Sequence, residues 1–390
     1  MNSVLKRICL ALILSIFVCG CTPKETRTII KFSSWGSKSE IEILTPILEN
    51  FEKENPDIKV DFMHIPQNYY QKVHLLFASN TSPDVIFLNN LYLPIYAKAR
   101  LLEDLSDQNL IDENFYSKPV KALSYNNKLY AIPRDISNLV IYYNKDLFDK
   151  NKVTYPNKNT TFEDFIKISQ KLTNIEKGIF AVSFEERPLF YLPYLMSEGG
   201  GFLSDDGEVE ILNTTESQNG INYYIDLRNK YHVAPLKSES ASATMAQMFL
   251  QGRIAMHLSG RWLVPKYRKV AKFDWDIAPF PKGTKGSIIP LDASGWAISA
   301  KSKHKQEAIR LIKYLSSKEN IEKFSESGLI VPARKDSANS KHFLDGKKPK
   351  TAQVFLDIIE TSKPTPVNEN YNEILDKIKK TLDPKFNKFN

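Results

Sequence analysis

Cysteine is the residue that this chain of 390 residues uses least, and all three cysteines lie within the first 21 positions. Residues 1–20 have the features of an export signal, so Cys21 is expected to be the only cysteine of the mature chain. A single cysteine excludes an intramolecular disulfide. The stability of the mature protein must therefore come from a hydrophobic core.

Catalytic and metal-binding patterns are also missing. The sequence contains no Gly-x-Ser-x-Gly elbow, no His-Glu-x-x-His and no phosphate-binding loop. Its six histidines are scattered without metal-ligand spacing. We therefore expect no catalytic residues, no metal and no cofactor.

Neither a second membrane span nor a nucleic-acid surface is indicated. No apolar run after the N-terminal segment approaches the length of about 18 residues that a membrane helix needs. The formal net charge is +8, and it falls by two when Lys6 and Arg7 are removed with the signal. The remaining lysines alternate with acidic residues, and no basic stripe interleaved with aromatics is present. We expect a solvated surface and no nucleic-acid partner.

The N-terminus carries a short targeting segment. Lys6 and Arg7 precede an apolar run from Ile8 to Val18, which Gly20 and Cys21 follow. This ending resembles the bacterial lipobox, which implies a lipoprotein signal peptide at 1–20, a diacylated Cys21 that anchors the chain to the membrane, and a tether at 21–28. The alternative is an N-terminal core helix of a cytoplasmic protein.

Strands and helices alternate along the rest of the chain. Ile29 to Ser33, Ile58 to Phe62 and Val85 to Leu88 are predicted strands, and amphipathic helices separate them. This order is typical of a parallel sheet that helices cover on both faces. A polar stretch at 134–138 lies between two later apolar strands and is a candidate hinge. An amphipathic helix is predicted at 162–172, with Thr160 or Thr161 as its cap.

The stretch from Phe249 to Trp262 combines several of these signals. Met245, Met248 and Phe249 form one face of a helix that Gly252 ends. Residues 254–258 are predicted to form a buried strand, and a turn at Ser259 and Gly260 leads to Trp262. Open α/β sheets bind ligands beyond the carboxyl ends of their strands, so this indole is a candidate ligand contact.

A series of short motifs resembles one known family, the bacterial extracellular solute-binding proteins of family 1. The motifs occur in the family's order over nearly the whole mature chain, and they include Ser34-Trp35-Gly36, Ser82-Pro83-Asp84-Val85, the segment from Tyr143 to Phe148, the turn from Gly199 to Leu212, Ser294-Gly295-Trp296 and Val331-Pro332-Ala333-Arg334. Their number and order, rather than any single motif, carry the resemblance. After the last predicted helix the chain stops at Asn390, where many relatives continue with another helix.

The resemblance implies an α/β fold of the two-lobe periplasmic-binding-protein type (class II), with a mostly parallel sheet in each lobe and a hinge between them. It places lobe 1 at 29–136 and 294–332, and lobe 2 at 137–293 and 333–390. It implies a monomeric lipoprotein at the extracytoplasmic face of the cell membrane, which binds a sugar or oligosaccharide and delivers it to the permease of an ABC transporter.

Candidate binding residues follow from the chemistry of a sugar, which has apolar C–H faces and a rim of hydroxyls. Three indoles near predicted strand ends are candidates for the faces: Trp35, Trp262 and Trp296. Five polar residues are candidates for the hydroxyls: Asn89, Asn90, Asp135, Glu40 and Arg334. The alternative for each indole is an ordinary core position. The alternatives for the polar residues are a turn, a helix N-terminus or an ion pair.

Three other functions stay open at this point. A carbohydrate-acting enzyme would need two carboxylates across a cleft, which a sequence cannot exclude. A ferric-ion protein of the same fold would use tyrosine pairs such as Tyr142-Tyr143 or Tyr223-Tyr224, although strand and helix packing explains both. A sensory or adhesive lipoprotein would bind sugar without transport.

Overall fold

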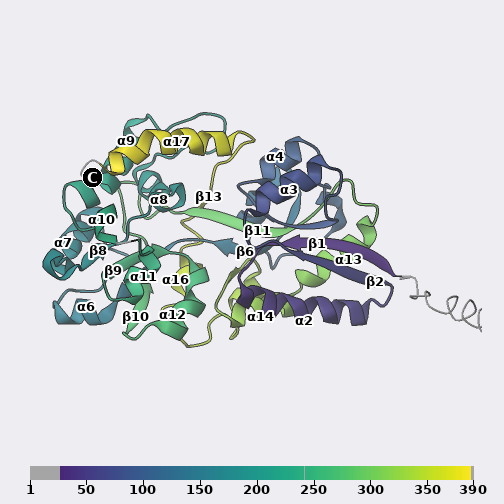
Figure 1. Cartoon of the computed structure of the whole chain (residues 1–390), viewed down its shortest axis with the longest axis horizontal. Coiled ribbons are helices and arrows are strands. Elements are labelled where there is room, and N and C mark those ends of the chain that lie inside the picture. Colours follow the sequence, from purple (N-terminus) through teal and green to yellow (C-terminus); the bar gives the residue numbers. More distant parts are fainter. Residues whose placement is uncertain (1–26, 241, 388–390) are drawn as a thin grey trace, which may run out of the picture.

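Two β-sheets with helices around them form the framework of the protein (Figure 1). The computed structural model describes residues 27–240 and 242–387, so the predicted signal peptide and Cys21 lie outside the described residues. Within the described residues, the larger sheet has seven strands in the order β12, β6, β11, β3, β1, β2, and β13 pairs with β11. The smaller sheet has the order β10, β7, β9, β8.

The strands of the larger sheet are β1 (Thr28–Ser34), β2 (Ile58–His64), β3 (Val85–Asn89), β6 (Ala131–Ser137), β11 (Pro290–Ile298), β12 (Val331–Pro332) and β13 (Lys363–Pro364). The strands of the smaller sheet are β7 (Val140–Asn144), β8 (Phe180–Val182), β9 (Ile254–Ser259) and β10 (Trp275–Ala278). A separate hairpin consists of β4 (Ser124–Tyr125) and β5 (Lys128–Leu129).

Helices surround both sheets. Up to residue 200 they are α2 (Lys38–Glu54), α3 (Tyr69–Ala78), α4 (Leu93–Lys98), η1 (Ser106–Gln108), α5 (Ser117–Ala122), α6 (Lys145–Lys150), α7 (Phe162–Leu172), η2 (Ile175–Lys177) and α8 (Pro188–Glu198). Beyond it they are α9 (Thr215–Asn229), α10 (Lys237–Ser240), α11 (Met245–Leu250), η3 (Arg261–Leu263), α12 (Val264–Val270), α13 (Lys305–Leu315), α14 (Lys318–Glu326), α15 (Lys335–Ala338), α16 (Val354–Asp357) and α17 (Tyr371–Phe386).

The carboxyl ends of the parallel strands β1 and β3 point toward the second half of the molecule. In Figure 1, α3 and α4 lie on one side of β1, and α2, α13 and α14 lie on the other. The smaller sheet and its helices form the opposite half, where α17 packs beside α9. Strands β6 and β11 connect the halves. The carboxyl ends of parallel strands are where an α/β sheet presents its ligand-binding side chains.

Both sheets have mixed strand directions, where we expected mostly parallel ones. β1 is parallel to β2 and β3, and β8 is parallel to β9. β11 is antiparallel to β3 and β6, and β7 is antiparallel to β9 and β10. The reason for β6 and β11 is their connectivity: β6 leads the chain out of the first half and β11 leads it back, so the two neighbours run in opposite directions.

Local sequence signals are confirmed where they are strongest. Helix α7 spans the predicted residues 162–172 and begins with a capping box between Thr161 and Asp164. Helix α11 is followed by Gly252 in the left-handed conformation (φ 71°), and all six residues of β9 are buried. The segment that ends at Trp262 therefore has the predicted helix and buried strand, but the predicted tight turn is absent: Ser259 still belongs to β9, Gly260 is extended, and η3 begins at Arg261.

The polar stretch at 134–138 differs from the expected irregular crossing. β6 continues through Ser137, because β11 pairs with it on one side and β12 on the other. The register against β11 shifts between Ser294 and Gly295, so Arg134 is an extra residue in a β-bulge. Pro133, which has no N–H to donate, immediately precedes the bulge, where a proline is tolerated in a sheet. Only Asn138 and Leu139 separate β6 from β7.

Stability should depend on pH through His257 in the middle of β9. This imidazole is 2% exposed, and its Nδ1 lies 2.6 Å from the hydroxyl of Tyr267. Burial, with a smaller contribution from Arg187, lowers the pKa of His257 to about 3 from its ordinary value of 6.5. Between these pH values, the His257 imidazole is therefore protonated in the unfolded chain and neutral in the folded protein. We expect the free energy of unfolding to fall by about 1.4 kcal/mol per pH unit from this residue as pH drops from about 6 to 4.

Urea unfolding at a series of pH values measures this effect. His257→Gln should flatten the fall in stability over that range, although the variant is less stable than the parent at pH 7. His304→Gln, which alters a partly exposed ring, is the matched control and should leave the slope unchanged. Equal slopes in the parent and in His257→Gln would show that this imidazole is already protonated in the folded protein.

Candidate functional site

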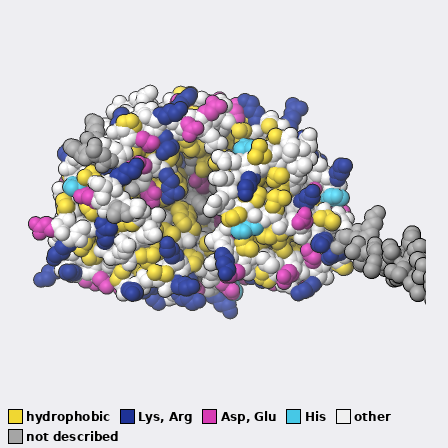
Figure 2. All heavy atoms as spheres, viewed as in Figure 1, with side chains coloured by type: hydrophobic (Ala, Val, Ile, Leu, Met, Phe, Trp, Pro, Cys, Tyr) yellow, Lys and Arg dark blue, Asp and Glu magenta, His cyan; other side chains and the backbone are white. Residues whose placement is uncertain are grey.

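A cleft lies where the two halves meet, and it consists of two compartments that share part of their lining. The outer compartment has a volume of about 1000 Å³ and the inner one about 260 Å³. The residues that line both are Trp35, Glu40, Trp262 and Leu329. Trp35 follows β1 of the larger sheet, whereas Trp262 follows β9 of the smaller sheet. Figure 2 shows that the surface is hollowed between the two halves.

The turn between β1 and α2 places a carboxylate in this cleft. Ser37 caps α2, and its hydroxyl accepts a hydrogen bond from the backbone N–H of Glu40. Gly36 has φ 143°, and a Cβ atom at this position would lie 2.8 Å from Oε2 of Glu40. Only glycine combines that backbone angle with this close approach. The Glu40 side chain consequently turns inward and is buried.

A buried arginine joins this carboxylate to the strand that crosses between the halves. Nη1 of Arg134 donates to Glu40 at 2.5 Å, and its Nε donates to Asp135 at 2.6 Å. The guanidinium lies 4.1 Å from the ring centre of Phe87 and 4.9 Å from that of Phe324. All three charged side chains are less than 10% exposed, so one cation stands between two carboxylates away from bulk water.

Burial and pairing act in opposite directions on these groups. Burial raises the pKa of Asp135, and the neighbouring Arg134 offsets part of this rise. For Arg134, burial acts to lower the pKa, but Asp135 and Glu40 together hold it above its ordinary value. The arginine is therefore charged at neutral pH and fixes both carboxylates in place.

Neutral polar groups complete the inner compartment. Asn89 ends β3, and its Nδ2 donates to the hydroxyl of Ser294 at 3.2 Å while its Oδ1 accepts from the N–H of Leu91. Ser137 and Ser294 also line the compartment. Carboxylate, amide and hydroxyl groups thus converge on a space of about 260 Å³. Such a set can both donate to and accept from a ligand with many hydroxyls.

The two indoles of the cleft differ in how they are held. Trp35 is half-buried, and its ring centre lies 4.3 Å from that of Phe87 and 5.0 Å from that of Tyr69. Trp262 is 37% exposed, which is unusual for so large an apolar side chain. Aromatic rings that are exposed in a cleft supply flat apolar surfaces, and these suit the C–H faces of a ligand.

Five of the eight residues that we predicted to bind ligand therefore meet in one cleft: Trp35, Glu40, Asn89, Asp135 and Trp262. None of the other three lines either compartment. Asn90 lies in the turn after β3 and is 1% exposed, because its amide bonds to Asp292 and to the N–H of Ala293.

Trp296 and Arg334 also lie away from the cleft. The Trp296 ring is fully buried against the larger sheet, and its centre lies 4.6 Å from that of Phe87. Trp296 therefore occupies an ordinary core position, which was the alternative to a ligand contact. Arg334 forms ion pairs with Asp336 at 2.9 Å and Asp112 at 3.2 Å. Its guanidinium is engaged in these ion pairs, and Arg334 is not among the residues that line the cleft.

Several cleft residues were not predicted from the sequence. Those of the inner compartment are Arg134, Ile136, Ser137, Arg261, Ser294, Leu329 and Ile330. Arg134 and Ser137 belong to the polar stretch that we noticed, but an arginine is rarely buried, and the bulge that buries this one depends on pairing with β11. Leu329 and Ile330 are ordinary apolar residues with no local signal.

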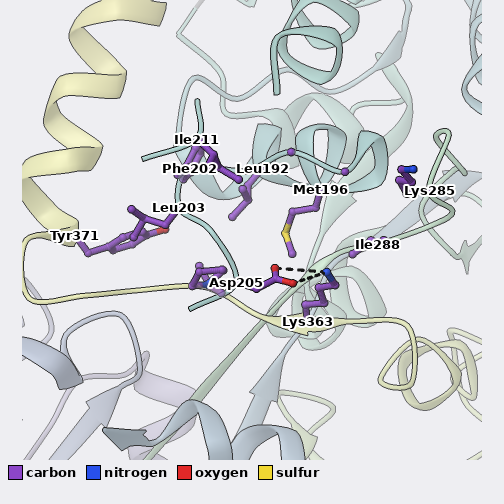
Figure 3. A pocket seen from close by; sticks show the side chains of 15 residues that line it. Leu192, Met196, Phe202, Leu203, Asp205, Ile211, Lys285, Ile288, Lys363 and Tyr371 are labelled. Carbon is purple, nitrogen blue, oxygen red and sulfur yellow. Dashed lines mark hydrogen bonds and ion pairs between the residues drawn. The ribbon is translucent and has the colours of Figure 1, made fainter. Parts of the chain in front are cut away.

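A second cavity, of about 450 Å³, lies in the second half of the molecule (Figure 3). Its lining is largely apolar and comes from α8, the glycine-rich turn after it, β13 and the start of α17. In Figure 3, Asp205 and Lys363 form an ion pair, and Met196 points toward it. No predicted binding residue lines this cavity, and the buried charged cluster of the cleft has no counterpart there.

Metal binding finds little support in the part of the chain that the structure describes. No group of three or more His, Cys, Asp or Glu side chains within residues 27–240 and 242–387 is placed to hold a metal ion. Three of the four tyrosines in the two pairs donate to backbone carbonyls: Tyr142 to that of Gly260, Tyr223 to that of Phe162 and Tyr224 to that of Glu185. Among the described helices, none is both long and apolar enough to cross a membrane.

Two α/β halves around a cleft, joined by crossing strands, define the class of two-lobe substrate-binding proteins. Residues 36–322 match the family of bacterial extracellular solute-binding proteins, and the chain belongs to this family. It is similar to the galactooligosaccharide-binding protein of Bacillus subtilis, with 24% identity over 94% of this chain and 88% of that protein. It is also similar to the maltodextrin-binding protein MdxE of B. subtilis, with 26% identity over 83% and 78% of the two chains.

A solved structure agrees with this assignment. An ABC substrate-binding protein from Listeria monocytogenes in complex with cycloalternan superposes with a TM-score of 0.85 at 25% identity. The match covers 93% of this chain and 95% of that one. The two-lobe fold that the sequence predicts is therefore confirmed.

The buried arginine yields a prediction about stability. Arg134→Met should lower the free energy of unfolding by about 3–5 kcal/mol at pH 7, because two buried carboxylates then lose their common cation. Urea unfolding measures the loss. The matched control is Arg310→Met, which removes an exposed partner of Asp57 and should lower the stability far less than Arg134→Met does, because solvent screens an exposed ion pair. Similar losses in both variants would mean that the buried cluster does not stabilise the fold.

Proposed function

We propose that this protein captures a sugar or oligosaccharide in the cleft and delivers it to the permease of an ABC transporter. The observation that carries the proposal is the meeting of two partly exposed indoles with two buried carboxylates, a partly buried amide and hydroxyl groups in one cleft. A buried sugar hydroxyl without a partner costs about 1–3 kcal/mol, so a specific site needs several such groups. The sugar-binding relatives support the same ligand class.

Capture works by closure of two lobes. We propose the division into lobe 1 (29–136 and 294–332) and lobe 2 (137–293 and 333–390), with the chain crossing between them three times. A ligand that contacts Trp35 on one lobe and Trp262 on the other gains both contacts only when the lobes are close. Binding therefore shifts the equilibrium toward the closed form, which the permease recognises.

The N-terminus would determine where in the cell the protein is held. A lipid on Cys21 and the tether at 21–28 would hold the receptor at the extracytoplasmic face of the membrane, close to the permease. Export of the chain fits its family of extracellular binding proteins. Growth with a radioactive lipid precursor and a Cys21→Ser variant tests the anchor independently of ligand binding.

Binding without catalysis is the better account of the two carboxylates. A glycoside hydrolase needs one carboxyl group that holds a proton and a second that attacks or activates water. Glu40 and Asp135 both accept hydrogen bonds from the same guanidinium, so one oxygen of each carboxylate is already engaged. The function that we propose therefore includes no catalytic step.

A screen of sugars tests the proposal. Thermal unfolding in the presence of monosaccharides, galactooligosaccharides and maltodextrins should reveal at least one sugar that raises the unfolding temperature, because a ligand of the folded state stabilises it by mass action. Trp262→Ala should then weaken binding of that sugar by about 1–2 kcal/mol, which is roughly five- to thirtyfold. Isothermal calorimetry measures the affinity.

The control for this experiment is Val270→Ala, which shortens an exposed apolar residue on α12 outside the cleft lining. It should bind sugar as the parent does. Normal binding by Trp262→Ala would place the site away from this cleft, and turnover of an oligosaccharide during the incubation would contradict a pure binding function.

A further inference from the structure

The indole of Trp262 lies directly on the backbone of Gly260, with no side chain between them. A Cβ atom built on Gly260 would lie 1.9 Å from Cζ3 of Trp262, 2.3 Å from Cε3 and 2.4 Å from Cη2. Real carbon atoms never approach so closely without a bond. The six-membered ring of the indole thus occupies the space in which any other residue would place its side chain.

The need for glycine here is steric and does not come from the backbone conformation. Gly260 has φ −98° and ψ 178°, values that any residue adopts. An alanine at this position would therefore leave the backbone undisturbed and displace only the ring. This separates Gly260 from the glycines with a left-handed conformation, such as Gly252, where a substitution strains the chain itself.

The backbone under the ring is anchored to the core of the smaller sheet. The hydroxyl of Tyr142 on β7 donates to the carbonyl of Gly260 at 2.8 Å, and the phenol is fully buried. The Tyr142 ring packs edge-on against Tyr267 at 5.2 Å and lies 5.7 Å from Trp275. The connection from the core to the cleft therefore runs from the phenol to the glycine carbonyl, and from the glycine backbone to the indole.

We propose that Gly260, held by Tyr142, is a positioning residue that fixes the ring of Trp262 as a flat wall of the ligand site. With one side of the six-membered ring supported by backbone, the exposed surface of the indole is presented to the cleft in one orientation. A ring already held in its binding orientation loses less conformational freedom when a sugar stacks on it. This inference rests on the proposed function for its ligand, but the placement of the ring is testable without any ligand.

The ligand-free test is fluorescence quenching by acrylamide. Gly260→Ala should make one tryptophan more accessible to the quencher, because the displaced indole moves away from the backbone. The contribution of Trp262 is identified by repeating the measurement in a Trp262→Phe background, where the added methyl group should change nothing. Thermal unfolding without ligand should show that Gly260→Ala remains folded. Unchanged quenching in Gly260→Ala would overturn the inference, even if no sugar is ever found to bind.

The binding test is a double-mutant cycle with the sugar found in the screen. Gly260→Ala alone should weaken binding at least fivefold, to within about twofold of Trp262→Ala. In the Trp262→Ala background, the same change should have no further effect. Gly201→Ala is the matched control, since the nearest atom to its added Cβ would be at an ordinary 3.4 Å, and it should bind as the parent does. Additive losses, or full affinity in Gly260→Ala, would contradict a positioning role.

A conservative change of Tyr142 tests the anchor. Tyr142→Phe keeps the buried ring but removes its hydrogen bond to Gly260, and it should weaken binding two- to fivefold and raise the quenching of Trp262. A purely structural tyrosine would lower the unfolding temperature without altering either readout. If the parent protein binds none of the sugars, the proposed function fails, whereas the quenching results still decide the role of Gly260.

Discussion

The guanidinium of Arg134 is the interaction on which the geometry of the cleft depends. It joins Glu40 in the first turn of α2 to Asp135 on the strand that leads into the second lobe. A buried ion pair of this kind is weak evidence for stability, because desolvation offsets its attraction. The ion pairs instead determine geometry. Arg134 is held in a bulge between Phe87 and Phe324, so its guanidinium fixes the positions of both carboxylates. The inner compartment is thereby preorganised before any ligand arrives.

The two walls of the cleft hold their side chains in place by different interactions. On the first lobe, charge pairing and an amide fixed by Ser294 and Leu91 hold the polar groups. On the second lobe, an exposed indole lies on a glycine that the buried core holds from behind. Polar groups give direction and an aromatic ring gives area. A ligand with hydroxyls around an apolar face satisfies both walls only if it lies between them.

The sequence predicted what local patterns encode. Helix α7, strand β9 and the glycine after α11 follow from periodicity and capping, and Trp262 follows from its place after a buried strand. Trp296 has the same local signal, but it lies within the long strand β11, and its ring is buried against Phe32 and Phe87. Asn90 has the same local signal as Asn89, but it lies in the turn after β3, where Asp292 and Ala293 engage its amide. Burial of Arg134 depends on a bulge against β11, about 160 residues further along the chain, and no local pattern specifies that pairing.

Glycine illustrates why a motif of small residues is ambiguous when it is read alone. Ser259 and Gly260 suggested a tight turn, which implies a special backbone angle, yet Gly260 is extended and any residue could adopt its conformation. What the position requires is the absence of a side chain, because a ring two residues later takes that volume. Gly36 requires both, since its angle is left-handed and Glu40 approaches it closely. Both glycines stand next to a cleft residue, and in both cases the missing side chain is what lets that residue face the ligand site. The shape of the cleft therefore depends on glycine at these two positions as well as on the residues that line it.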